Sequence, residues 1–172
     1  MEMSEGIARR PAWHARYRWV TYLNTLAALV WTALMVLPFA PFSDVPPIIV
    51  GGGPGTWLTV AYLMFLVVGI GGFGVLSSLL ATMELHEGRL VDSKVMWPAS
   101  VLLCVGFVGG CILLGTAGAV GGYESTFEGA STAAIHDLLS PYVYPITALT
   151  LAAVIGAVLV VLSMARARWP AA

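Results

Sequence analysis

The sequence predicts an all-α integral membrane protein, a bundle of four transmembrane helices. Three observations predict this class: the chain is 59% hydrophobic and only 10% charged, it contains long uncharged apolar runs, and its basic residues lie outside those runs. Soluble domains contain about 25% charged residues, so this composition is typical of a chain surrounded by lipid. The formal net charge of -1 also argues against nucleic acid as a partner, because phosphate binding requires clustered Lys and Arg.

Each apolar run is long enough to cross the hydrocarbon core as a helix, which takes about 20 residues. The predicted spans cover residues 19–37, 56–82, 96–119 and 143–165. The first is interpreted as a retained span and not as a signal peptide, because no small-residue cleavage site follows it. The second is the longest of these runs, so we expect it to tilt or to project beyond the bilayer. We expect residues 1–172 to form a single four-helix domain.

The basic residues predict how the helices are oriented. They lie in the N-terminal arm, in the loop around residues 83–95 or in the C-terminal tail: Arg9, Arg10, Arg16, Arg18, Arg89, Lys94, Arg166 and Arg168. Because cytoplasmic loops carry an excess of Lys and Arg, we expect both termini and this loop to lie on the cytoplasmic side of the cell membrane. The segments around residues 39–55 and 120–142 then face outward.

The two outer segments have different predicted structures. Residues 39–55 contain several prolines and a triple glycine, so we expect neither a helix nor a central strand there. In the second outer segment, residues 131–139 are predicted to form a short helix along the outer interface, with Ser131 or Thr132 as N-cap and Pro141 beyond its end.

Small residues recur at helical spacing in three of the predicted spans. Such small-xxx-small faces allow helix backbones to approach closely in lipid, where packing is the main source of helix association. The candidate packing residues are Gly71, Gly74 and Ser78 in the second span, Gly106, Gly110, Gly118 and Gly122 in the third, and Ala148, Ala152 and Gly156 in the fourth. The alternative is that Gly and Ala are simply common in membrane helices. The sequence leaves open whether these faces point into the bundle or toward a partner.

The glycine-rich stretch GIGGFG, residues 69–74, is not interpreted as a dinucleotide-binding loop. Such a loop needs a strand before it and an accessible polar turn, and here both flanks are apolar. No ionisable residue lies in the central part of any predicted span. Because proton relays and ion-coupled transporters place such groups inside the membrane, this absence argues against those functions.

The remaining candidate sites lie at the ends of the helices. His14 and His86 are both expected at the inner interface, where they are weak candidates for binding a haem, although no cofactor is predicted. The outer segments carry weak candidates for a metal site: Glu124, Glu128, His136 and Asp137. This acidic outer surface is also suited to docking a basic soluble partner, such as an electron carrier.

The sequence favours a non-catalytic integral-membrane subunit of a larger membrane complex, such as a respiratory oxidase or a related electron-transfer assembly. The reasons are the absence of charge within the spans, the surplus of small-residue faces and the short loops. The expected partners are other integral membrane subunits or further copies of this chain, within the lipid bilayer. The first alternative is a homo-oligomeric channel or carrier for a neutral small solute. The second is a small haem- or quinone-binding membrane protein.

Overall fold

The computed structural model describes residues 12–168, which are helical apart from short connections, as predicted. Within this range, four helices are long and apolar enough to cross a membrane, which is the architecture of a multi-pass membrane protein. They are α1 (Trp13–Val36), the continuous helix Gly55–His86, α5 (Ser93–Thr126) and α6 (Thr132–Ala165). Arg9 and Arg10, on which the predicted orientation partly depends, lie outside the described residues.

The second long helix switches from α-helical to π-helical winding twice along its length. It consists of α3 (Gly55–Met64), the π-helical segment η2 (Phe65–Gly72), α4 (Phe73–Ala81) and the π-helical segment η3 (Thr82–His86). Together these segments form one rod of 32 residues, and Gly88, with φ of 66°, follows its end. This rod was predicted to be the longest span, but α5 and α6 each have 34 residues. The difference arises because α5 and α6 continue through polar turns beyond their apolar runs.

The first outer segment contains more helix than the sequence predicts. Its residues form the 3-10 turn η1 (Phe42–Asp44) and the short helix α2 (Val45–Val50). The expectation that prolines exclude a helix here is wrong, because Pro46 and Pro47 occupy the first turn of α2. In a first turn the backbone N–H groups have no partner within the helix, so proline costs little there.

In the second outer segment, the predicted short helix does not end before Pro141. Ser131 is the N-cap, as predicted, and its Oγ accepts a hydrogen bond from the backbone N–H of Ala134 at 3.3 Å. The helix that begins at this cap is α6, which includes both Pro141 and Pro145 and continues to Ala165. The structure therefore does not support an independent interfacial helix over residues 131–139. Proline is tolerated in long apolar helices when neighbouring groups compensate for the lost hydrogen bond.

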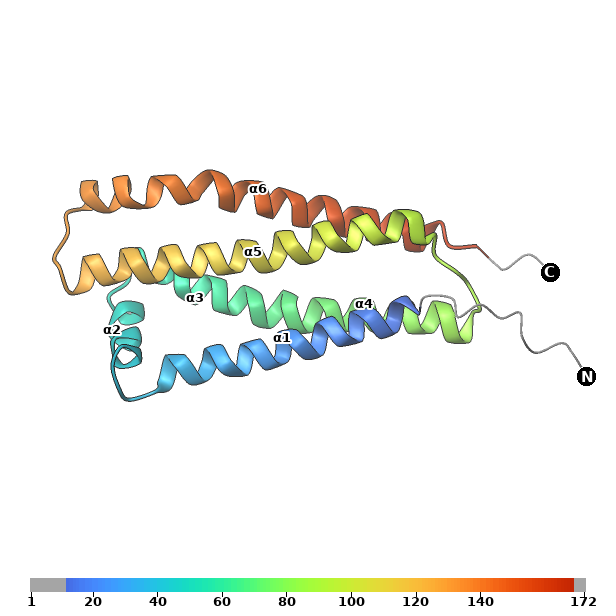
Figure 1. The fold of residues 1–172 in the computed structure, drawn as a ribbon, viewed down its shortest axis with the longest axis horizontal. Coiled ribbons are helices and arrows are strands. Elements are labelled where there is room, and N and C mark those ends of the chain that lie inside the picture. The colour runs from blue at the N-terminus through green and yellow to red at the C-terminus, as the bar shows by residue number, and fades with distance from the viewer. Residues whose placement is uncertain (1–11, 169–172) are drawn as a thin grey trace, which may run out of the picture.

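The long helices lie side by side in the order α1, the rod, α5, α6, so that α1 and α6 are the two edge helices (Figure 1). We call this arrangement the open order of the helices. α1 packs against η2 and α4, α5 packs against α3, and α6 packs against α5. The start of α1, the end of η3, the start of α5 and the end of α6 share one end of the molecule. We call this the terminal end. Its assignment to the cytoplasmic side stays a prediction.

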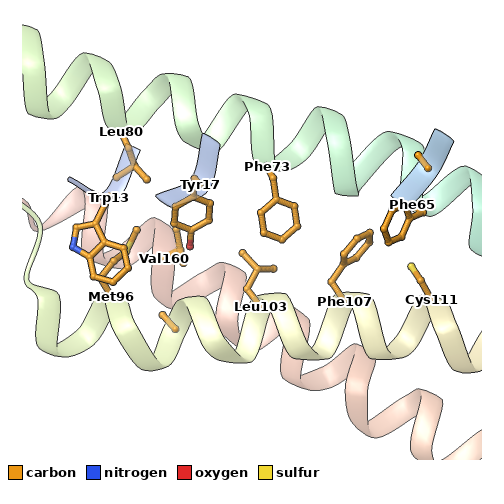
Figure 2. Packing of buried hydrophobic residues seen from close by; sticks show 12 residues of the cluster. Trp13, Tyr17, Phe65, Phe73, Leu80, Met96, Leu103, Phe107, Cys111 and Val160 are labelled. Carbon is orange, nitrogen blue, oxygen red and sulfur yellow. The ribbon is translucent and has the colours of Figure 1, made fainter. Parts of the chain in front are cut away.

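Aromatic side chains form the core between α1, the rod and α5 (Figure 2). Tyr17 stacks on Phe73 with ring centroids 6.0 Å apart, and Phe107 lies 5.8 Å from Phe73 and 5.9 Å from Phe65. Ring pairs at these distances contribute about 0.5–1.5 kcal/mol each beyond their burial. The row of rings fixes the three helices against one another along the length of the bundle.

Candidate functional site

Glycines bring α5 and α6 into backbone contact near the middle of both helices. A Cβ atom added at Gly106 would lie 2.5 Å from the backbone N of Ala153 and 2.5 Å from the backbone O of Leu149. From the opposite side, a Cβ at Gly156 would lie 2.8 Å from the backbone O of Ala99. These distances are too short for a real Cβ atom, so only glycine allows this approach. Such contacts supply packing energy where lipid removes the hydrophobic driving force.

The other pair of predicted glycines in α5 makes a second close contact, this time with α3. A Cβ at Gly118 would lie 2.8 Å from the carbonyl carbon of Trp57, and a Cβ at Gly122 would lie 3.0 Å from Cα of Gly55. Gly55 itself has no space for a side chain, because a Cβ there would meet the backbone of Ile48. The predicted face of α5 therefore serves two interfaces, one with α6 and one with α3. Gly110 is less restricted, with its nearest neighbour at 3.9 Å.

The structure places the small residues of the second span differently. Gly71 is exposed, and no atom lies within 4 Å of a Cβ added there. Gly74 is near only the methyl group of Thr21, at 3.8 Å, and Ser78 is exposed. We call the exposed Gly71 and Ser78, together with the half-buried Gly74 between them, the uncovered glycine face. The three candidate packing residues of the last span do not share one environment either.

In α6, Gly156 is buried, Ala152 is half-buried and Ala148 is exposed. Besides Gly156, the residues that contact α5 here are Leu149 and Ala153, as the Gly106 contacts show. The contact face of α6 therefore includes Leu149, Ala153 and Gly156, and it shares only Gly156 with the predicted face. Side-chain spacing predicts that a face exists, but its rotation depends on the neighbouring helix.

A buried amide ties α1 to the π-helical segment η2. The side-chain Nδ2 of Asn24 donates a hydrogen bond to the backbone O of Gly69 at 2.8 Å. A Cβ at Gly69 would lie 3.1 Å from the Phe107 ring and 3.6 Å from Asn24 Nδ2, so the position is closely surrounded. Asn24 is among the polar residues that the sequence places at membrane depth. Hydrogen bonds of this kind hold helices together in lipid.

His14 is paired with a carboxylate at the terminal end of the molecule. Its Nδ1 lies 2.6 Å from Oε2 of Glu84. The same carboxylate accepts hydrogen bonds from the backbone N–H groups of Trp13 at 3.1 Å and His14 at 3.3 Å. These are the first residues of α1, so η3 supplies the cap of another helix. The negative charge also matches the positive end of the α1 dipole.

The structure gives His14 a partner other than His86, which is exposed at the end of η3. A haem between these two histidines gains no support from the contacts of His14. Close to His86 in the sequence, Glu87 and Arg89 form an ion pair, with Nη1 of Arg89 and Oε2 of Glu87 3.3 Å apart. The hypothesis of a haem- or quinone-binding protein stays a prediction.

The candidate metal ligands of the second outer segment lie where α5 ends and α6 begins. Glu124 is half-buried in the last turns of α5, whereas Glu128, His136 and Asp137 are exposed. Over residues 12–168, no three side chains of His, Cys, Asp and Glu are grouped closely enough to hold a metal ion. A docking role for this surface stays a prediction.

The fold and these contacts define a multi-pass helical membrane protein that uses close glycine contacts inside the bundle and leaves one small-residue face uncovered. Comparison with protein-family models, with curated proteins and with solved structures finds no match for the chain.

Proposed function

We propose that the chain is a non-catalytic integral-membrane subunit of a larger membrane complex, and that the uncovered glycine face is where it contacts another subunit. The observation that carries this proposal is the contrast between Gly71 and Gly106. In α5, glycine is matched by a neighbouring backbone, whereas at Gly71 no neighbour within the chain uses the space. Glycine costs roughly 1 kcal/mol in a helix relative to alanine, and a partner helix offsets that cost.

The open order of the helices supports the same proposal. α1 contacts mainly the rod, and α6 contacts mainly α5, so both edge helices leave most of their surface free. Exposed apolar side chains alone are expected of any lipid-facing helix. Small residues are different, because they add little contact with lipid but allow close approach of another helix. The favoured setting is a respiratory oxidase or a related electron-transfer assembly in the cell membrane, with both termini cytoplasmic.

The test is a gentle detergent extraction with a tag at the C-terminus, followed by a native mass measurement and an absorbance spectrum. We expect the wild-type chain in a hetero-complex and Gly71→Leu mostly released from it. Ala148→Leu is the matched control, because Ala148 is also small and exposed but lies on α6, away from the uncovered glycine face. This control should remain in the complex.

The other outcomes decide between the alternatives. A colourless homo-oligomer would favour the channel or carrier, and flux of a neutral solute into liposomes containing only this chain would establish it. A Soret band in a peak of this chain alone would favour the haem protein. A stable monomer of wild type under mild extraction would contradict the proposal.

A further inference from the structure

A hollow of about 520 Å³ lies at the terminal end, between the start of α5 and the end of α6. Its walls combine apolar, hydroxyl and charged side chains: Leu90, Val91, Asp92, Val95, Leu159, Leu162, Ser163, Arg166 and Arg168. Two of the lining residues, Leu90 in the loop and Arg168 in the tail, are joined by backbone pairing. The N–H of Leu90 donates to the O of Arg168 at 2.9 Å, and the N–H of Arg168 donates to the O of Leu90 at 3.1 Å.

The charges of the hollow suit a singly charged anion. Arg166 and Arg168 contribute two positive charges and Asp92 one negative charge, which leaves a net charge of +1 among the lining residues. Asp92 already accepts a hydrogen bond from the backbone N–H of Lys94 at 2.9 Å, as the N-cap of α5. The nearby Arg89 is also engaged, because its Nη2 donates to the backbone O of Ala167 at 3.1 Å. The two arginines of the hollow are therefore the groups that face a ligand.

Ser163 is a second, independent observation that points to a ligand in the hollow. It lines the hollow, only 5% of its surface is exposed, and its Oγ has no hydrogen-bond partner among the described residues. Serines in helices commonly donate to the backbone O four residues earlier, as Ser100 does to Met96 at 2.7 Å. A buried hydroxyl without a partner is unfavourable, so an acceptor in the hollow would satisfy it.

We infer that this hollow binds the phosphodiester headgroup of a glycerophospholipid, with the guanidinium groups of Arg166 and Arg168 on the phosphate and the Ser163 hydroxyl donating to one of its oxygens. A phosphodiester carries one negative charge, equal and opposite to the net charge of the lining residues. Basic pockets between membrane helices are suited to lipid headgroups. The inference does not depend on the proposed assembly, because none of these residues belongs to the uncovered glycine face.

The apolar part of the wall favours a lipid over free phosphate. Val95 and Leu162 are 41% and 42% exposed, so both extend from the hollow to the outer surface of the spans. Acyl chains attached to a headgroup in the hollow would lie along these side chains. Inorganic phosphate would gain nothing from them.

The experiment is a native mass titration of the purified chain with dioleoyl phosphatidylglycerol. We expect one tightly held lipid per chain, and an affinity about 30-fold lower in Arg166→Gln/Arg168→Gln, because each basic residue near a membrane surface contributes about fivefold. Ser163→Ala should lower the affinity by about tenfold or more, the effect of one hydrogen bond to a charged group. Arg18→Gln is the matched control, since Arg18 is exposed at the same end but does not line the hollow.

Each further outcome has a defined meaning. Equal weakening by Arg18→Gln, or equal binding of a diacylglycerol without phosphate, would overturn the headgroup assignment. Displacement of the lipid by millimolar inorganic phosphate would show that the hollow is a free-phosphate site and would overturn the lipid assignment. Circular dichroism of each variant establishes that lost binding is not lost fold, and the conservative Ser163→Ala variant tests the same site without a change of charge.

Discussion

Gly106 and Gly71 are the same residue type in opposite environments. At Gly106 the α6 backbone occupies the position of a side chain, whereas at Gly71 the corresponding space within the chain is empty. The sequence assigns both to small-residue faces, and spacing alone does not separate them. The distinction depends on helix rotation, which is set by all the neighbours of a helix and not by its own residues.

The two glycines should therefore respond oppositely to the same substitution. Gly106→Ala forces α5 and α6 apart, and we expect it to lower the free energy of unfolding of the purified chain by about 2 kcal/mol or more. Gly71→Ala, which meets no atom of the chain, should raise it by roughly 0.5–1 kcal/mol through helix propensity. Unfolding in mixed micelles followed by circular dichroism measures both. Equal effects of the two substitutions would contradict the packing of α6 on α5.

At the scale of elements, hydropathy predicts the four spans because each must satisfy its backbone in lipid over its whole length. The Ser131 cap is also predictable, since capping is local. Two other features of the elements are not predictable from the local sequence. The continuation of α6 through Pro141 depends on the apolar sequence that follows, and the helix α2 depends on prolines that fall in a first turn.

The cap of α1 is a third feature that sequence patterns do not predict. The carboxylate that caps this helix is 71 and 70 residues along the chain from the two backbone N–H groups that donate to it. The residue before α1 is Ala12, whose side chain cannot cap the helix. The cap comes from Glu84 in η3, whose side chain is only 8% exposed. His14 lies at the terminal end of the molecule, and its pairing with Glu84 depends on the tertiary fold.

Removal of this cap should destabilise the start of α1. We expect Glu84→Ala to lower the free energy of unfolding by about 1–2 kcal/mol, because two backbone N–H groups and His14 lose their acceptor. Glu87→Ala is the matched control: its carboxylate is 41% exposed and pairs only with Arg89, so its loss should cost less than about 0.5 kcal/mol. Chemical unfolding of both variants in one detergent gives the comparison. A Glu87→Ala effect as large as that of Glu84→Ala would show that Glu84 is not a cap.

For the whole molecule, the same open order of helices has two consequences. The aromatic core ties α1, the rod and α5 together, while α6 depends on α5 and its glycines. The terminal end collects the start of α1, the loop 87–92 and the end of α6. The positive-inside rule concerns this same end, because the basic residues of the described part of the chain lie here: Arg16, Arg18, Arg89, Lys94, Arg166 and Arg168.

This arrangement predicts the labelling pattern of introduced cysteines in intact cells. A membrane-impermeant maleimide added outside should label Ser125→Cys, at the end of α5, and should leave Lys94→Cys, at its start, unlabelled until the cells are permeabilised. Cys104 and Cys111 lie between these positions in α5, half-buried and buried, so a polar reagent should not reach them and the wild-type chain serves as the blank. The reverse pattern would invert the predicted orientation. Labelling of both positions without permeabilisation would contradict α5 as a membrane-crossing helix, because its two ends must lie on opposite sides of the bilayer.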